Sequence, residues 1–205
     1  MHNPSDLWDH RYAKGERGVY EPWLERWKDV LVGHGDQALE LGCGVGYDTE
    51  VLTKWGFEVT ALDVSQVAVR YSTRRNPGAI HRVMDMRGIV SLVPGFDVVV
   101  ASLSLHYFNR KDTVTIFEDV RRLLNPRGIL AFRVNASDDV ESGAPADAAS
   151  WTRISVDGVS KQFFTPEKIA TVLQGPWRIL SQEKLTTQRY GHRKSIFEVI
   201  AQVQK

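Results

Sequence analysis

The feature that most constrains this chain is an apolar run that ends in an acid and continues into three alternating glycines. The stretch from Ala38 to Gly46 reads ALELGCGVG, and the residues after it have the pattern of a helix. A strand that breaks into a glycine loop at a helix start lets backbone N–H groups approach a ligand that a Cβ atom would keep away. The dinucleotide fingerprint places its third glycine at the sixth position, which is Tyr47 here. The loop therefore predicts a ligand site of a different kind.

Short apolar runs alternate with helical segments along most of the chain. Strands are predicted at 37–41, 58–62, 80–83, 96–101 and 129–134, and helices at 46–55, 66–74 and 111–124. Asn125 to Gly128 is predicted as a turn. Strands separated by helices of this length form right-handed crossovers and a parallel sheet that helices cover on both faces. The pattern predicts a doubly wound α/β fold, with residues 1–205 as a single domain.

The last part of the chain departs from this alternation. Thr165 and Pro166 predict a helix start, and that helix is expected to run to about Leu173. Extended segments at 177–188 and 195–203 flank a short connection, which predicts an antiparallel hairpin. Residues 135–162 are predicted to be a long polar loop that covers the substrate site, because loops of this length in compact domains are often lids.

The acid two residues before the Gly-x-Gly-x-Gly run resembles the first motif of class I S-adenosylmethionine-dependent methyltransferases. Asp63, Asp85 and Ser102 follow the next three strands, and open α/β sheets bind ligands beyond the carboxyl ends of their strands. The resemblance implies a Rossmann-like sheet of seven strands, mostly parallel, in the order 3-2-1-4-5-7-6 with a C-terminal antiparallel hairpin. It also implies S-adenosyl-L-methionine as the cofactor and S-adenosyl-L-homocysteine as its product.

The resemblance assigns roles to these side chains. Asp63 would accept hydrogen bonds from both ribose hydroxyls, Asp85 would accept from the adenine amino group, and the residue after it would pack on the ring. The alternatives are structural roles: a helix cap for Asp63, a surface turn for Asp85 and a helix-dipole partner for Glu40. Ser65 is the better placed cap. The cofactor-binding residues expected are Trp8, Tyr12, Glu40, Gly42, Gly44, Asp63, Val64, Asp85, Met86 and Ser102.

The first residues, Leu7 to Tyr12, are similar to the openings of tellurite-resistance, thiopurine and halide methyltransferases. Trp8 and Tyr12 are four residues apart and would share one face of a helix. A sulfonium is a cation, and aromatic faces attract cations. Residues 1–30 are therefore expected to form a helical lid over the cofactor, with an ordinary amphipathic helix at the sheet edge as the alternative.

Methyl transfer from a sulfonium is an in-line displacement that depends on alignment and on exclusion of water. A general base is required only when the nucleophile carries a proton of high pKa. His106 and Tyr107 follow the fourth strand and are the candidate catalytic residues, His106 as a base and Tyr107 as a substrate-orienting group. The alternative for His106 is a structural role. No metal site is expected.

The composition limits the classes of binding partner that are expected. The formal net charge is +1 without a block of like charges, so no strong nucleic-acid or membrane signature is present. The chain has no apolar run that approaches a membrane span and no signal-peptide pattern, and its one cysteine, Cys43, is consistent with the cytoplasm. We expect a monomer or homodimer that methylates a small molecule. Methylation of an RNA or protein side chain, or cofactor binding by a non-catalytic regulatory protein, are the alternatives.

Overall fold

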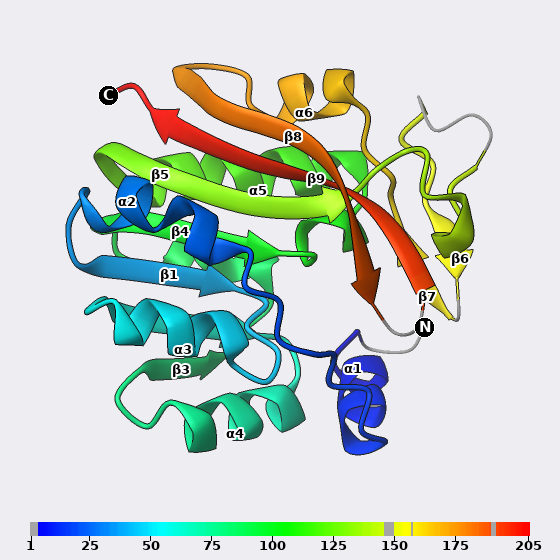
Figure 1. Cartoon of the computed structure of the whole chain (residues 1–205), viewed down its shortest axis with the longest axis horizontal. Helices are drawn as coiled ribbons and strands as arrows, with labels where there is room; N and C mark the ends of the chain where they lie inside the picture. The colour runs from blue at the N-terminus through cyan, green and yellow to red at the C-terminus, as the bar shows by residue number, and fades with distance from the viewer. Residues whose placement is uncertain (1–3, 146–149, 157, 190–191) are drawn as a thin grey trace.

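A seven-stranded sheet forms the centre of the computed structural model, which describes residues 4–145, 150–156, 158–189 and 192–205 (Figure 1). Its strands are β1 (Gln37–Leu41), β2 (Glu58–Asp63), β3 (Ile80–Val83), β4 (Phe96–Ser102), β5 (Leu124–Asn135), β8 (Trp177–Arg189) and β9 (His192–Val203). Their order is β3-β2-β1-β4-β5-β9-β8, and β9 runs antiparallel to both of its neighbours. Since β8 and β9 are the sixth and seventh strands of this sheet along the chain, the predicted order is confirmed.

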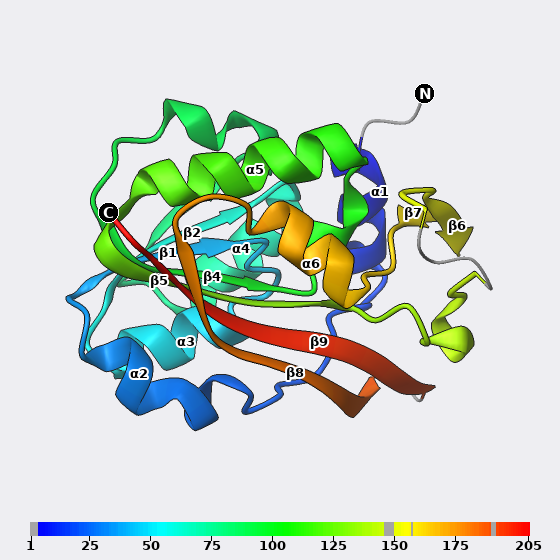
Figure 2. The same cartoon turned by 90° about the horizontal axis from the view of Figure 1, so that it is seen from above.

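Helices cover both faces of the sheet, which explains why the central strands read as continuous apolar runs. On one face, α5 (Arg110–Leu123), α6 (Pro166–Val172) and the short helix η2 (Met86–Ser91) share a core with Val99. On the other, α2 (Lys28–Val32), α3 (Tyr47–Lys54) and the short helix η1 (Leu24–Trp27) pack on Val98 and Val100. Figure 2 shows these helices on opposite sides of the strands. Successive residues of β4 therefore enter different cores.

The N-terminal segment reaches the carboxyl ends of the parallel strands. Helix α1 (Pro4–Ala13) lies at the end of the sheet to which the arrows of β1, β4 and β5 point, close to α4 (Gln66–Arg75) (Figure 1). A strap without helix or strand, residues 14–23, then runs back to η1 and α2. The helical segment predicted over 1–30 is therefore two helical pieces joined by this strap, and residues 1–3 lie outside the described part.

The turn predicted at Asn125 to Gly128 is wrong, because these residues belong to the long strand β5. Asn125 donates to the Asp97 carboxylate at 2.7 Å, and Leu124 pairs with Phe96, so pairing with β4 starts before the glycine. The register then shifts, and Arg127 takes a positive φ of 64°. Turn-forming residues here make an irregularity within a strand, which local composition does not distinguish from a turn.

The segment 135–162 is not a single loop as predicted. It contains a short helix, η4 (Val140–Ser142), and a two-stranded hairpin of β6 (Ile154–Val156) and β7 (Val159–Lys161). Strands of three residues are too short to give a periodic signal. Residues 146–149 and 157 of this segment lie outside the described part, as do Tyr190 and Gly191 of the predicted hairpin connection.

Candidate functional site

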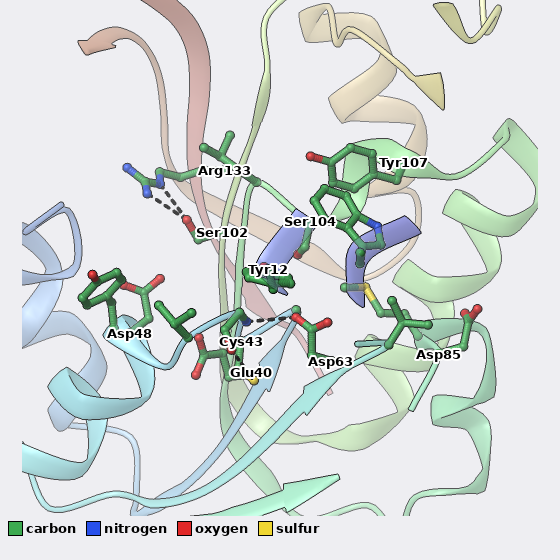
Figure 3. Close-up of a pocket in the computed structure, with 18 of the residues that line it drawn as sticks. Tyr12, Glu40, Cys43, Asp48, Asp63, Asp85, Ser102, Ser104, Tyr107 and Arg133 are labelled. Carbon is green, nitrogen blue, oxygen red and sulfur yellow. Dashed lines mark hydrogen bonds between the residues drawn. The ribbon is translucent and has the colours of Figure 1, made fainter. Parts of the chain in front are cut away.

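A cavity of about 260 Å³ opens at the carboxyl ends of β1, β2 and β4, where the sequence predicts the site (Figure 3). Among the predicted residues that line it, the cofactor-binding set is complete: Trp8, Tyr12, Glu40, Gly42, Gly44, Asp63, Val64, Asp85, Met86 and Ser102. Tyr107 lines it too, whereas His106 is not among the lining residues. The fold thus gathers side chains from the N-terminal helix, three strand ends and two short helices around one space.

The glycine loop lets backbone and side chains approach the cavity closely. Gly42 and Gly44 both have positive φ, 81° and 54°, which L side chains rarely adopt. A Cβ at Gly42 would lie 2.6 Å from the Cβ of Ser104, and a Cβ at Gly44 would lie 3.0 Å from the hydroxyl of Tyr12. Glycine at these positions therefore leaves the loop open to a ligand and lets Tyr12 rest directly against it.

Asp63 closes β2 and is held by the backbone on both sides. One carboxylate oxygen accepts the Gly44 N–H at 2.9 Å, and the other accepts the Ser65 N–H at 2.8 Å. Burial raises the pKa of Asp63 to about 6, against these N–H bonds, which lower it. Ser65 caps α4 by accepting the Ala68 N–H, so the capping role belongs to Ser65 as the sequence suggests. A carboxylate has further acceptor positions, so Asp63 can also receive ligand donors.

Glu40 lies deeper, at 3% exposure, and is hydrogen-bonded to the hydroxyl of Thr49. Burial raises the pKa of Glu40 to about 8, and the neighbouring carboxylates of Asp48 and Asp63 add to the rise. Asp48 stands in the first turn of α3 and also lines the cavity, although the sequence analysis did not single it out. This end of the cavity is therefore suited to a ligand that brings positive charge or hydrogen-bond donors.

The carboxylate of Asp85 is partly occupied by hydrogen bonds to the nearby Arg87. It accepts from the Arg87 backbone N–H at 2.9 Å and pairs with the Arg87 guanidinium at 2.5 Å, which makes Asp85 the cap of η2. Burial acts to raise the pKa of Asp85, but the Arg87 contacts outweigh it and hold the pKa below its ordinary value. Met86 lies buried beside it. The turn alternative thus describes the local structure of Asp85, while the side chain still faces the cavity.

Helix α1 is fixed to the rest of the site by an acid and by rings. Asp9 accepts the Ser65 hydroxyl at 2.6 Å and the Val67 N–H at 3.0 Å, so it holds the start of α4. The Trp8 ring meets the Tyr107 ring edge-on at 5.0 Å between centroids and lies 6.1 Å from the Tyr12 ring. The shared face of Trp8 and Tyr12 is as predicted, but the anchoring by Asp9 was not foreseen.

The strap that follows α1 is tied to the far side of the sheet. Glu21 pairs with the guanidinium of Arg133 at 2.7 Å and accepts the Thr187 hydroxyl at 2.8 Å. Arg133 also donates to the Ser102 hydroxyl, at 2.8 and 3.1 Å. Glu21 and Arg133 both line the cavity, and their side chains are 12% and 5% exposed. A charged residue inside the apolar strand β5 is the sequence signal that could have revealed Arg133.

A tryptophan secures the end of the same strap. The Trp23 ring lies beneath the Arg133 guanidinium, 4.7 Å from its centre, and its Nε1 donates to Asp48 at 2.9 Å. Trp23 is buried. The strap, the end of β5 and the start of α3 are therefore bound together at one side of the cavity.

His106 is placed differently from the expectation. It belongs to the short helix η3 (Leu105–Tyr107), is 1% exposed, and its ring lies 4.3 Å from that of Tyr107. Its carbonyl accepts the Gln162 N–H at 2.7 Å. The turn of η3 directs Tyr107 to the cavity and leaves His106 in the wall behind it. The structure therefore does not place His106 in the lining of the cavity.

The comparisons with known proteins agree with this geometry. Residues 38–128 match the family described as "Methyltransferase domain". The chain thus carries a methyltransferase domain of the class I S-adenosylmethionine-dependent type. YqeM of Bacillus subtilis is 32% identical over 123 residues, which are 58% of this chain and 49% of that protein. The malonyl-[acyl-carrier protein] O-methyltransferase of Enterobacter lignolyticus is 30% identical over 141 residues, 68% of this chain and 53% of that protein. This methyltransferase chain spans about half the length of the curated relatives it matches.

Solved structures support the fold of the methyltransferase. An S-adenosylmethionine-dependent methyltransferase from Anabaena variabilis aligns with a TM-score of 0.76 at 16% identity, covering 100% of this chain and 96% of that one. TehB from Haemophilus influenzae aligns with a TM-score of 0.66 at 15% identity, covering 98% of this chain and 67% of that one. At these identities the likeness concerns the fold.

None of the described helices is both long and apolar enough to cross a membrane. In the same described ranges, no three or more His, Cys, Asp or Glu side chains gather in a way that could hold a metal ion.

Proposed function

We propose that this protein transfers a methyl group from S-adenosyl-L-methionine to a small-molecule acceptor, with S-adenosyl-L-homocysteine as product. The observation that carries the proposal is the meeting of Glu40, Asp63 and the glycine loop around one cavity at the strand ends. Two buried carboxylates beside a glycine-rich loop fit a ligand that combines ribose hydroxyls with a cationic amino-acid end. Bound there, the cofactor supplies a sulfonium methyl group with a neutral leaving group.

The lining residues divide the cofactor between them. Asp63 accepts hydrogen bonds from the ribose hydroxyls and Val64 lies beside it, while Asp85 and Met86 contact the adenine. Glu40, Gly42 and Ser102 surround the methionine end, and Trp8 and Tyr12 place their rings near the sulfonium. Gly44 keeps the loop thin at the point where Tyr12 meets it.

The lid and the outer segment exclude water from the reacting groups. In this proposal the lid expected over residues 1–30 consists of α1 and the strap, because Asp9 and the Trp8–Tyr107 contact hold α1 against the cavity, whereas η1 and α2 pack on a face of the sheet. Residues 135–162 cover the acceptor side, because Arg153 lines the cavity and the Gln162 amide donates to the Phe108 carbonyl at 2.5 Å. The chain acts as one domain, as a monomer or homodimer in the cytoplasm.

Tyr107 orients the acceptor, and no histidine base is used. A soft or already ionised nucleophile requires no proton removal, so alignment accounts for the rate. We expect His106→Ala to keep the pH profile of the turnover rate, because that ring lies behind Tyr107. Circular dichroism would verify that the variant is folded. Loss of a titration near neutral pH in the rate profile would contradict this assignment and restore His106 as the base.

The proposal is tested in two steps. Calorimetry with S-adenosylmethionine and S-adenosylhomocysteine measures cofactor binding, and the absence of heat with both ligands would reject the proposal. Cell extract is then divided by ultrafiltration, and production of S-adenosylhomocysteine is measured with each fraction. We expect turnover with the low-molecular-mass filtrate. Turnover only with the retained fraction would indicate a macromolecular acceptor, including acyl groups on a carrier protein, for which one relative is named.

A further inference from the structure

A row of polar side chains leads from the buried carboxylate of Glu40 to a histidine on the outer strand of the sheet. The Thr49 hydroxyl bonds to Glu40 and lies 3.5 Å from the Ser72 hydroxyl. The Ser72 hydroxyl lies 2.9 Å from Nε2 of His81, and Nδ1 of that ring lies 3.1 Å from the Ala79 carbonyl oxygen. Four elements, β1, α3, α4 and β3, contribute one member each from Glu40 to His81.

The row is closed to solvent along its length and open at its end. Thr49 and Ser72 are completely buried, and Glu40 is nearly so. His81 is only partly buried, in the edge strand β3. The row passes directly behind the glycine loop, since a Cβ at Gly46 would lie 2.4 Å from the Ser72 hydroxyl. The row therefore gives a proton on Glu40 a path of polar contacts to the protein surface that does not cross the cavity, with the 3.5 Å Thr49–Ser72 contact as its longest link.

Counting protons shows that this row has two self-consistent arrangements. Nδ1 of His81 faces a carbonyl and so carries a hydrogen, which leaves Nε2 of a neutral ring as an acceptor for Ser72. With Glu40 protonated, donation runs outward from Glu40 through Thr49 and Ser72 to His81. With Glu40 ionised and His81 cationic, every donation is reversed. With Glu40 ionised and His81 neutral, neither hydroxyl has a proton for the other.

We propose that Thr49 and Ser72 are positioning residues that relay a proton between Glu40 in the cavity and His81 on β3. The Glu40 O–H bond breaks as Thr49 takes that proton, Thr49 passes its own to Ser72, and Ser72 passes its own to Nε2 of His81. The products are a carboxylate and an imidazolium. The charge and the number of protons are conserved, so the step requires no other reactant.

The charged surroundings favour the outward arrangement when the cavity holds no ligand. Burial raises the pKa of Glu40, and Asp48 from α3 and Asp63 from β2 add to the rise. The thiol of Cys43 faces Glu40 and Asp63 and is hydrogen-bonded to the Ser72 side chain. Burial also lowers the pKa of His81, against the effect of the Ala79 carbonyl. Both directions keep the proton on Glu40 and the imidazole neutral.

A cationic ligand would move the proton outward. This step rests on the proposed function, because the ammonium of the cofactor is the group expected to favour ionised Glu40. The relay then stabilises the imidazolium, so the pKa of His81 should rise when the cofactor binds. A buried carboxylate can in this way change its charge while the cofactor blocks the cavity.

The relay is tested first without any ligand. Carboxyl-carbon NMR follows the titration of Glu40, with the signal assigned from its absence in Glu40→Gln. Ser72→Ala removes the acceptor that Thr49 uses only when Glu40 is protonated, so the Glu40 midpoint should fall. Thr73→Ala is the matched control, because its hydroxyl donates to the Val69 carbonyl on the same helix. An unchanged midpoint in Ser72→Ala would overturn the relay.

The second arm measures the His81 ring by NMR with and without S-adenosylhomocysteine, while calorimetry reports binding independently. The pKa of His81 should rise on binding in the wild type and in Thr73→Ala, and should not respond in Ser72→Ala that still binds the ligand. A ligand that binds without moving the wild-type His81 pKa would refute the coupling. An absence of binding would reject the proposed function and leave the decision on the relay to the unliganded titration.

Discussion

The cavity is built from two halves that differ in how the chain specifies them. Its floor consists of Glu40, Gly44 and Asp63, which follow adjacent strands and are held by backbone N–H groups and buried hydroxyls. Its roof consists of Trp8 and Tyr107, which meet through ring contacts between segments far apart in sequence. Strand ends fix the floor by local chain geometry, whereas only tertiary packing assembles the roof. Single substitutions in the floor should therefore have larger effects than single substitutions in the roof.

The largest effect is expected in the floor, from Asp63→Asn. The amide cannot accept on both sides, so either the Gly44 or the Ser65 N–H loses its partner and the ribose loses a charged acceptor. We expect calorimetry to show affinity for S-adenosylhomocysteine reduced about 100-fold. Asp97→Asn is the control, because Asp97 accepts the Gln37 N–H at the opposite end of the sheet. Equal affinity losses in both variants would mean that global stability, and not the floor, was measured.

The second effect concerns charge in the floor and appears without a ligand. The folded pKa of Glu40 is raised from 4.5 to about 8, so the folded state binds more protons than the unfolded state across this window, and stability falls as pH rises through it. Denaturant unfolding should give a wild-type free energy about 2 kcal/mol lower at pH 8 than at pH 6. Glu40→Gln should flatten this slope. Restricting the comparison to pH 6 and above limits the contribution of Asp63, whose pKa is about 6.

A smaller effect is expected where the roof meets the floor. Tyr12→Ala removes the ring whose hydroxyl rests against Gly44, and we expect cofactor affinity to fall about 10-fold. Tyr12→Phe keeps the ring and should retain most of the affinity. Titration calorimetry of both variants separates the contribution of the Tyr12 ring to cofactor affinity from that of its hydroxyl. Wild-type affinity and turnover in Tyr12→Ala would show that α1 is an ordinary helix at the sheet edge and not a lid.

The smallest effect is expected from Asp9→Asn, which loosens the attachment of the roof to α4. Both donors bind the same oxygen of Asp9, so the amide oxygen of Asn can still accept from the Ser65 hydroxyl and the Val67 N–H but without the negative charge. Thermal unfolding should report a loss of about 1 kcal/mol, typical of a weakened helix cap. The adjacent His10→Asn is the matched control on the same helix. A loss of S-adenosylhomocysteine affinity as large as that of Asp63→Asn would remove the distinction between the two halves.

The residues of the floor could be predicted from the sequence because the rules that identify them are local. The glycine loop, the acid before it and the acid that ends β2 follow from strand ends in a doubly wound sheet, and the strand order follows from the same family pattern. Sequence reasoning missed Glu21 and Arg133, which meet across 112 positions of sequence, and it misplaced His106, whose direction depends on a single turn of η3. Such contacts depend on how segments pack after folding, and spacing along the chain carries no record of them.

Strand β9 has a consequence for how the protein is made. It lies between β5 and β8 and pairs with both, so residues 192–203 fill a slot inside the sheet. Until these residues leave the ribosome, a nascent chain would carry β5 with an unpaired edge and β8 without a partner. That open edge is the kind of surface on which chains associate wrongly. Among the strands of this sheet, the one synthesised last is thus the one that joins β8 to the parallel core.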